Sequence, residues 1–208
     1  MADRFSADST RDRILAAAAD EFAAHGVSGA RIDRIARRAR SSKERVYAHF
    51  RSKTALYHAV AEVELGQMAE AVELDVDDLP GYAGRVHDYF TANPSHLRLL
   101  QWGRMESSAA GAEADPFRDA VRRIVSDGVD ELREAQRRGR VDPAWDPLDV
   151  MVLVHQLALA WVGQGDLADV VHDDRVAAGD RRRKAVVAAV GQLFPAAVAG
   201  TAGGTRPA

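Results

Sequence analysis

The side chains best suited to chemistry in this sequence are cationic and hydrogen-bonding groups gathered in one short segment, residues 43–49 (KERVYAH). Arginine can donate two parallel hydrogen bonds to guanine in a major groove, so Arg45 is the residue expected to read a base sequence. Tyr47 and His49, together with Lys53 just beyond the segment, are expected to bind phosphates, which position a protein on DNA without reading bases. The chemistry that these residue types offer is recognition of double-stranded DNA.

This segment needs a second helix to hold it in place. A helix-turn-helix consists of two short packed helices, the second of which enters a major groove. The first is predicted from about Gly29 or Ala30 to Ala39, because its apolar residues share one face and its alanines allow close approach. Ser42 is placed to cap the second helix, and Val46 is its expected inward anchor. The candidate DNA-binding residues are Arg40, Ser42, Lys43, Glu44, Arg45, Tyr47, His49 and Lys53.

Proline, glycine and capping residues divide the chain into about nine predicted helices, and no segment alternates as a strand would. Ser9 and Asp12 resemble a capping box at the start of the first helix. Gly26 is expected to end that helix, because glycine tolerates a left-handed conformation. Further helices are predicted over residues 53–74, 82–92, 94–108, 116–138, 147–167 and 175–194. The predicted fold class is all-α, and residues 196–208, rich in alanine, glycine and threonine, are expected to be disordered.

Charge is distributed unevenly along the chain, although the net charge is only -3. The first 58 residues contain 12 Lys and Arg against 7 Asp and Glu, whereas residues 59–208 contain 16 against 24. Such asymmetry indicates a basic functional module on an acidic body, with chance clustering as the alternative interpretation.

The sequence lacks the residues that several classes of function require. The chain has no cysteine, so disulfides, thiolate metal sites and a cysteine nucleophile are excluded. Paired Glu-x-x-His motifs, a glycine-rich phosphate loop and a nucleophile elbow are also missing from the sequence, so we expect neither an enzyme nor a cofactor. The charged N-terminus does not read as a secretory signal, and the apolar stretches are too short to span a bilayer. A cytoplasmic protein without a membrane partner is therefore expected.

Three segments together resemble the tetracycline-repressor (TetR) family of bacterial regulators: TRDRILAAAADEFAAHG, RIDRIARRA and VYAHFRSKTAL. The specific element is the spacing of Tyr47, Phe50, Lys53 and Leu56, and the resemblance runs from about Thr10 to Leu56. It implies a helix-turn-helix domain of three helices over residues 1–52. It also implies a larger helical ligand-binding and dimerisation domain over residues 53–195, followed by the tail 196–208.

The chain departs from the family pattern at three places in this region. Arg40 stands where a glycine is usual, which implies a strained or shifted turn, or a gained phosphate contact. Ala30 replaces a threonine that normally caps the second helix and binds phosphate. Glu44 and Arg45 occupy positions where small residues are common, which implies an unusual operator or a contact from Glu44 to a cytosine amino group.

In similar proteins the middle helices enclose a small molecule, and its binding changes the spacing of the two DNA heads. Buried polar groups and aromatic residues in that region are the candidates for the pocket. His155 interrupts an apolar run and belongs to the pocket, to a dimer seam or to the core as a satisfied histidine. The candidate ligand-binding residues are His87, Phe90, Leu100, Trp102, Met105, Glu106, His155 and Trp161, and they imply a mainly hydrophobic effector of drug or metabolite size.

The last two predicted helices are strongly apolar and contain small residues that allow close helix contact. Pairing of both helices across a two-fold axis would give a four-helix bundle and a homodimer, whereas the alternative is that they only complete the monomer core. The expected function is a homodimeric repressor that a small molecule releases from a palindromic operator. The alternative is a dimeric DNA-binding regulator that has no small-molecule ligand and is constitutive or answers to a protein partner.

Overall fold

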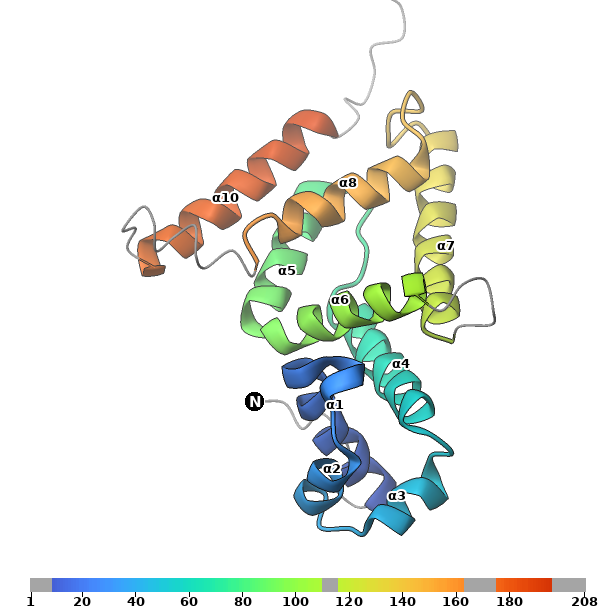
Figure 1. Cartoon of the computed structure of the whole chain (residues 1–208). Coiled ribbons are helices and arrows are strands. Elements are labelled where there is room, and N and C mark those ends of the chain that lie inside the picture. The colour runs from blue at the N-terminus through green and yellow to red at the C-terminus, as the bar shows by residue number, and fades with distance from the viewer. Residues whose placement is uncertain (1–8, 110–115, 163–174, 196–208) are drawn as a thin grey trace, which may run out of the picture. The chain divides into compact units, whose positions relative to one another are not determined.

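A computed structural model describes residues 9–109, 116–162 and 175–195, and within these ranges the chain forms nine helices and no strand (Figure 1). The predicted all-α fold is confirmed. The predicted tail and residues 163–167 of one predicted helix lie outside the described residues. The helices are α1 (Thr10–Gly29), α2 (Ile32–Arg38), α3 (Lys43–His49), α4 (Lys53–Ala71), α5 (Leu79–Ala92), α6 (Pro94–Ala109), α7 (Pro116–Arg137), α8 (Pro147–Leu159) and α10 (Arg175–Leu193).

The chain divides into two compact units that alternate along the sequence. Unit 1 comprises Met1–Ala71 and Ala92–Ile124, and unit 2 comprises Val72–Thr91 and Val125–Ala208. Unit 1 therefore contains α1 to α4 together with α6, whereas unit 2 contains α8, α10 and nearly all of α5. The helix α7 begins in unit 1 and ends in unit 2.

Serine side chains start the helices where the sequence predicts them. The Ser9 hydroxyl accepts a hydrogen bond from the backbone N–H of Asp12 at 3.1 Å. In the same way the Ser42 hydroxyl accepts from the N–H of Arg45 at 3.2 Å and starts α3. Because these hydroxyls satisfy N–H groups that have no partner within their helices, the starts of α1 and α3 are fixed locally.

The start of α2 differs from the prediction. The helix begins at Ile32 rather than at Gly29 or Ala30, and it ends at Arg38. Gly26, with φ 67° and ψ 177°, interrupts α1 as expected, but a further helical turn follows it and takes up the residues through Gly29. The N–H of Arg31 then donates to the buried carboxylate of Glu21 at 3.0 Å. This side chain from α1, which replaces a local cap, holds the start of α2.

Other helix boundaries differ for similarly local reasons. The helix α5 starts at Leu79 instead of residue 82, because the Asp78 carboxylate accepts from the N–H of Gly81 at 2.8 Å. Pro80 fits in the first turn, where its missing N–H costs little. The helix α4 ends at Ala71 rather than at residue 74, and α8 ends at Leu159 rather than at residue 167.

The core of unit 1 lies where α1, α4 and α6 meet. The rings of Phe22 on α1 and Tyr57 on α4 pack edge to face, with centroids 5.3 Å apart. The Tyr57 hydroxyl donates to the carbonyl of Leu99 on α6 at 2.9 Å, so this buried tyrosine leaves no unsatisfied hydroxyl. In Figure 1, α2 and α3 pack together beside α1, and α4 leads away from α3.

In unit 2, α8 and α10 pack against each other. Val150 and Val154 on α8 and Val190 on α10 are fully or almost fully buried. Trp145, just before α8, packs edge to face on Phe194 at 5.1 Å. In the described residues, none of the helices combines the length and the apolar character needed to cross a membrane.

Candidate nucleic-acid interface

The helices α1, α2 and α3 form a three-helix head, and α3 packs on the rest of the head by one face only. Val46 is 1% exposed and packs into the core of unit 1, as predicted. The side chains predicted to contact DNA from this helix are all exposed, namely Lys43, Glu44, Arg45, Tyr47 and His49. An exposed polar face on a helix with a single inward anchor is the geometry that entry into a major groove requires.

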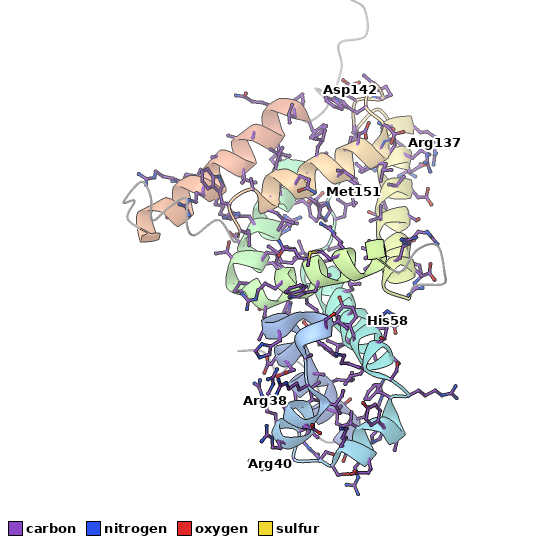
Figure 2. All side chains as sticks on the ribbon, in the orientation of Figure 1. Arg38, Arg40, His58, Arg137, Asp142 and Met151 are labelled. Carbon is purple, nitrogen blue, oxygen red and sulfur yellow. The ribbon has the colours of Figure 1, made fainter. Side chains whose placement is uncertain are left out.

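The turn between α2 and α3 places Arg40 at the surface of the head (Figure 2). Arg40 has φ 50°, the left-handed conformation that glycine adopts without cost. The N–H of Ser41 donates to the carbonyl of Ala36 at 2.9 Å, so the turn closes α2 as a Schellman motif. Of the alternatives given for Arg40, the left-handed φ supports the strained turn.

Glycine in place of Arg40 is expected to stabilise the protein by about 0.5–1 kcal/mol, because it removes the left-handed strain. If Arg40 also binds phosphate, the same variant loses affinity for every duplex. The check is thermal unfolding alongside binding to a mixed-sequence duplex. In the control Arg38→Gly, glycine enters a helical position and should destabilise the protein. A stability loss in Arg40→Gly would contradict the strain.

Beside α3 lies an open hollow of about 610 Å³, formed by α2 and the start of α3. Cations dominate its wall, which comprises Arg31, Asp33, Arg34, Ala36, Arg37, Ser41 and Lys43. The Arg34 guanidinium forms an ion pair with Glu21, and the ammonium of Lys43 lies 3.4 Å from the carboxylate of Asp33. Within the described part of the chain, the guanidinium groups of Arg31 and Arg37 have no carboxylate at ion-pair distance. These two side chains are available for phosphate.

The sequence-based site did not include Arg31 and Arg37. A signal for them was present, because both lie off the apolar face of α2. Sequence alone did not show that this polar face and α3 border one hollow.

Glu44 is a carboxylate on the exposed face of α3. Its own backbone N–H at the start of α3 and the Ser42 hydroxyl hold the pKa of Glu44 below its ordinary value. Glu44 is therefore charged at neutral pH. It repels phosphate and suits an amino group such as that of cytosine.

Lys53, which starts α4, is directed to the protein backbone. Its ammonium donates to the carbonyls of Ser28 and Ala30 at 3.1 and 3.4 Å. These bonds tie α4 to the connection between α1 and α2. The predicted phosphate contact of Lys53 would have to share the ammonium with both carbonyls.

The ligand candidates on α6 have different environments. Leu100 is half-buried against the core of unit 1, and Trp102 packs over Gly26. Met105 is 55% exposed, and the side chain of Glu106 is outside the described ones.

In unit 2, His87 and Phe90 are buried, whereas Trp161 is exposed and carries the guanidinium of Arg182 4.9 Å from its ring centroid. None of the seven ligand candidates whose side chains are described lines the hollow beside α3. The same holds for a second described cavity, of about 90 Å³, at residues 76–80, 140–142 and 194–195.

His155 forms a hydrogen-bonded chain inside unit 2. Its Nδ1 lies 2.8 Å from the Met151 carbonyl, and its Nε2 lies 3.0 Å from the Tyr82 hydroxyl. A carbonyl only accepts, so Nδ1 donates to the Met151 carbonyl, and Nε2 is the atom that pairs with the tyrosine hydroxyl. Burial raises the pKa of Tyr82 to about 12, which keeps it a donor. Of the alternatives for His155, this arrangement favours the satisfied interior histidine.

A three-helix head that presents an exposed polar helix beside a basic hollow, followed by an all-α body, defines the class of helix-turn-helix DNA-binding regulators. Residues 14–60 match the family described as bacterial regulatory proteins, tetR family. Residues 78–192 match the tetracyclin repressor-like C-terminal domain. The chain belongs to the tetR family of transcription regulators.

Two relatives from Streptomyces coelicolor are similar over most of their length. The HTH-type transcriptional repressor SCO4008 is 36% identical over 171 residues, which cover 76% of this chain and 86% of the relative. The crystal structure of the regulator SCO4942 has 50% identity and a TM-score of 0.75, and the match covers 90% of this chain and 99% of that one. The repressor NicS of Pseudomonas putida is 34% identical over 102 residues, 45% of this chain and 48% of the relative.

Proposed function

We propose that this protein is a homodimeric transcriptional repressor that reads a palindromic operator with α3 and leaves it when a small molecule binds the body. The observation that carries the DNA-binding part is the exposed face of α3 with the basic hollow beside it. Arg45 is the base-reading residue of this proposal, and Arg31, Arg37 and Arg40 are its phosphate ligands. Repression is supported by SCO4008 and NicS, both of which are described as repressors.

The dimer is proposed to form through α8 and α10. Leu148 and Val152 lie one helical turn apart on α8 and are each 47% exposed, and Leu193 on α10 is 41% exposed. Large apolar side chains left in solvent along neighbouring helices favour burial against a second copy. A two-fold dimer would place two copies of α3 about 34–36 Å apart, as successive major grooves require.

The effector is proposed to be a small, mainly hydrophobic molecule bound in the helical body, because the C-terminal region matches the tetracyclin repressor-like domain. The second candidate is a dimeric DNA-binding regulator without such a ligand. That candidate is favoured because the seven ligand candidates whose side chains are described are absent from the walls of both described cavities. Saturable binding of a small molecule that lowers DNA affinity would separate the two.

Alanine in place of Arg45 is expected to cost about 1–3 kcal/mol of affinity for a duplex selected from a random pool by the wild-type protein. The loss on a scrambled duplex should be much smaller, because only the selected duplex offers the guanine contact. The measurement is equilibrium binding to both duplexes over a range of salt concentrations, with sedimentation to establish the dimer.

The matched control is Arg122→Ala, which removes the same charge from an exposed position on α7. It should leave both affinities nearly unchanged. Equal losses on both duplexes for Arg45→Ala would show that Arg45 does not read a base. A wild-type protein that is monomeric, or that has no salt-dependent affinity for any duplex, would overturn the proposed function itself.

A further inference from the structure

Two ionisable side chains meet in the interior of unit 1. Glu64 on α4 and His96 on α6 are 3% and 7% exposed, and they are two of only four buried polar or charged residues among those described. The carboxylate oxygen Oε2 of Glu64 lies 2.7 Å from Nε2 of His96. The other two buried residues, Glu21 and His87, are bonded elsewhere.

A buried pair of ionisable side chains is not needed for the stability of unit 1, because apolar side chains could fill the same space. In the described structure no aligned hydrogen-bond donor reaches either oxygen of Glu64, so the close contact with His96 is its compensation. Replacing such a buried pair by apolar side chains of similar size is often neutral or stabilising. What the pair adds over apolar packing is a close polar contact between α4 and α6, which the low local dielectric strengthens.

The same helix α6 contacts α1 and α4 at three further points. The carbonyl of Leu99 accepts from the Tyr57 hydroxyl at 2.9 Å on α4. Nε of Arg98 donates to the carbonyl of Ala23 on α1 at 3.3 Å, and the Trp102 ring covers Gly26. Each contact reaches either α1, which packs against α2, or α4, which follows α3 in the chain.

We propose that the Glu64–His96 pair is the positioning joint that fixes α6 on α4, and that the placement of α6 at this joint sets the orientation of α3 for DNA. This inference rests on the proposed function. It assigns to Glu64 and His96 a role in DNA affinity, although neither side chain is on the surface and neither can contact DNA. Both are positioning residues that act through α4.

The test uses the double variant Glu64→Leu with His96→Leu, which removes the joint without leaving a buried charge. We expect its midpoint of thermal unfolding to be unchanged or raised, while affinity for the duplex selected by the wild-type protein falls about tenfold. The matched control is Glu62→Gln, which removes a carboxylate from the exposed face of the same helix. It should change neither quantity.

A second readout does not depend on DNA. Because the chain has no cysteine, spin labels at Glu70→Cys on α4 and Gln101→Cys on α6, both exposed, report one distance within unit 1. We expect one narrow distance distribution with the joint intact and a broader or shifted one in the double variant. If the double variant does not fold, Glu64→Gln provides the same comparison, because it keeps the volume and removes the charge.

An unchanged distance distribution, or an unchanged affinity in a variant whose distribution has broadened, would overturn the positioning role. Both of these outcomes differ from failure of the proposed function. If the proposed function fails, the wild-type protein itself binds no duplex, and the spin-label distances alone then decide whether the Glu64–His96 pair fixes α6 on α4.

Discussion

Alanine in place of Gly26 is expected to lower the free energy of unfolding of unit 1 by about 2–5 kcal/mol. Two independent causes add. The backbone at φ 67° and ψ 177° lies in a region that only glycine occupies readily. A Cβ atom would also lie 3.0 Å from two ring atoms of Trp102, so the indole would have to move off its packed position.

The measurement for Gly26→Ala is denaturant unfolding followed by the fluorescence of Trp102, in a background where the other two tryptophans are replaced by phenylalanine. The matched control is Gly66→Ala on α4, where no atom beyond the neighbouring residues and the local helix backbone lies within 4 Å of the added methyl group. That control should gain about 0.5–1 kcal/mol, because alanine favours a helix interior over glycine. Similar effects of the two substitutions would contradict the constraint at Gly26.

Glutamine in place of Glu21 is expected to cost about 1.5–3 kcal/mol at neutral pH, the contribution typical of hydrogen bonds to a charged group. Glu21 is 2% exposed, and its carboxylate accepts from the Arg34 side chain at 2.7 Å and from the N–H of Arg31 at 3.0 Å. Burial opposes its ionisation. The bonds from Arg34 and Arg31 and the nearby charges outweigh burial, and they lower the pKa of Glu21 below its ordinary value of 4.5.

The sign of the pH dependence follows from this lowered pKa. The stabilisation by Glu21 is fully present above the ordinary pKa of 4.5 and is lost as the pH falls through the lower value of the folded state. The stability difference between the wild-type protein and Glu21→Gln should therefore shrink as the solution is acidified below about pH 4.5. Urea unfolding at several pH values measures it.

Asp20→Asn is the control for Glu21→Gln, because it removes a neighbouring carboxylate of α1 that pairs with Arg38 at the surface. An exposed pair of this kind contributes about 0–1 kcal/mol. A difference between the wild-type protein and Glu21→Gln that stays constant from neutral to acid pH would show that the charge of Glu21 does not hold α2.

Much of the fold follows from short-range chemistry that is visible in the sequence. Ser9 and Ser42 start helices because a hydroxyl can cap only the N–H groups a few residues ahead of it. The start of α2 could not be predicted in this way, because its partner, Glu21, is supplied by another helix. The same limit applies to the pair Glu64 and His96, since an isolated polar residue on a helix gives no signal that it is buried.

The candidate site could likewise be predicted from the sequence only where it depends on residues close together in the chain. The exposed face of α3 follows from one inward residue, Val46, among polar neighbours. The hydrogen bonds of Lys53 to backbone carbonyls depend on how α4 meets the connection between α1 and α2, which spacing along the chain does not reveal. Sequence likewise selected His155 correctly as a polar residue that needs partners, but it could not name Tyr82 as one of them.

The alternation of the two units along the chain has a consequence for the gene as well as for the protein. A stop codon after residue 71 would produce α1 to α4 without α6. The packing of Leu99 and Leu100 on the core of unit 1, and the backbone carbonyl that accepts from Tyr57, would be lost. A single recombination crossover at that point would equally separate the head from its own packing partner. Exchange of specificity between relatives of this protein is therefore expected to proceed by point substitutions on α3 rather than by shuffling of whole heads.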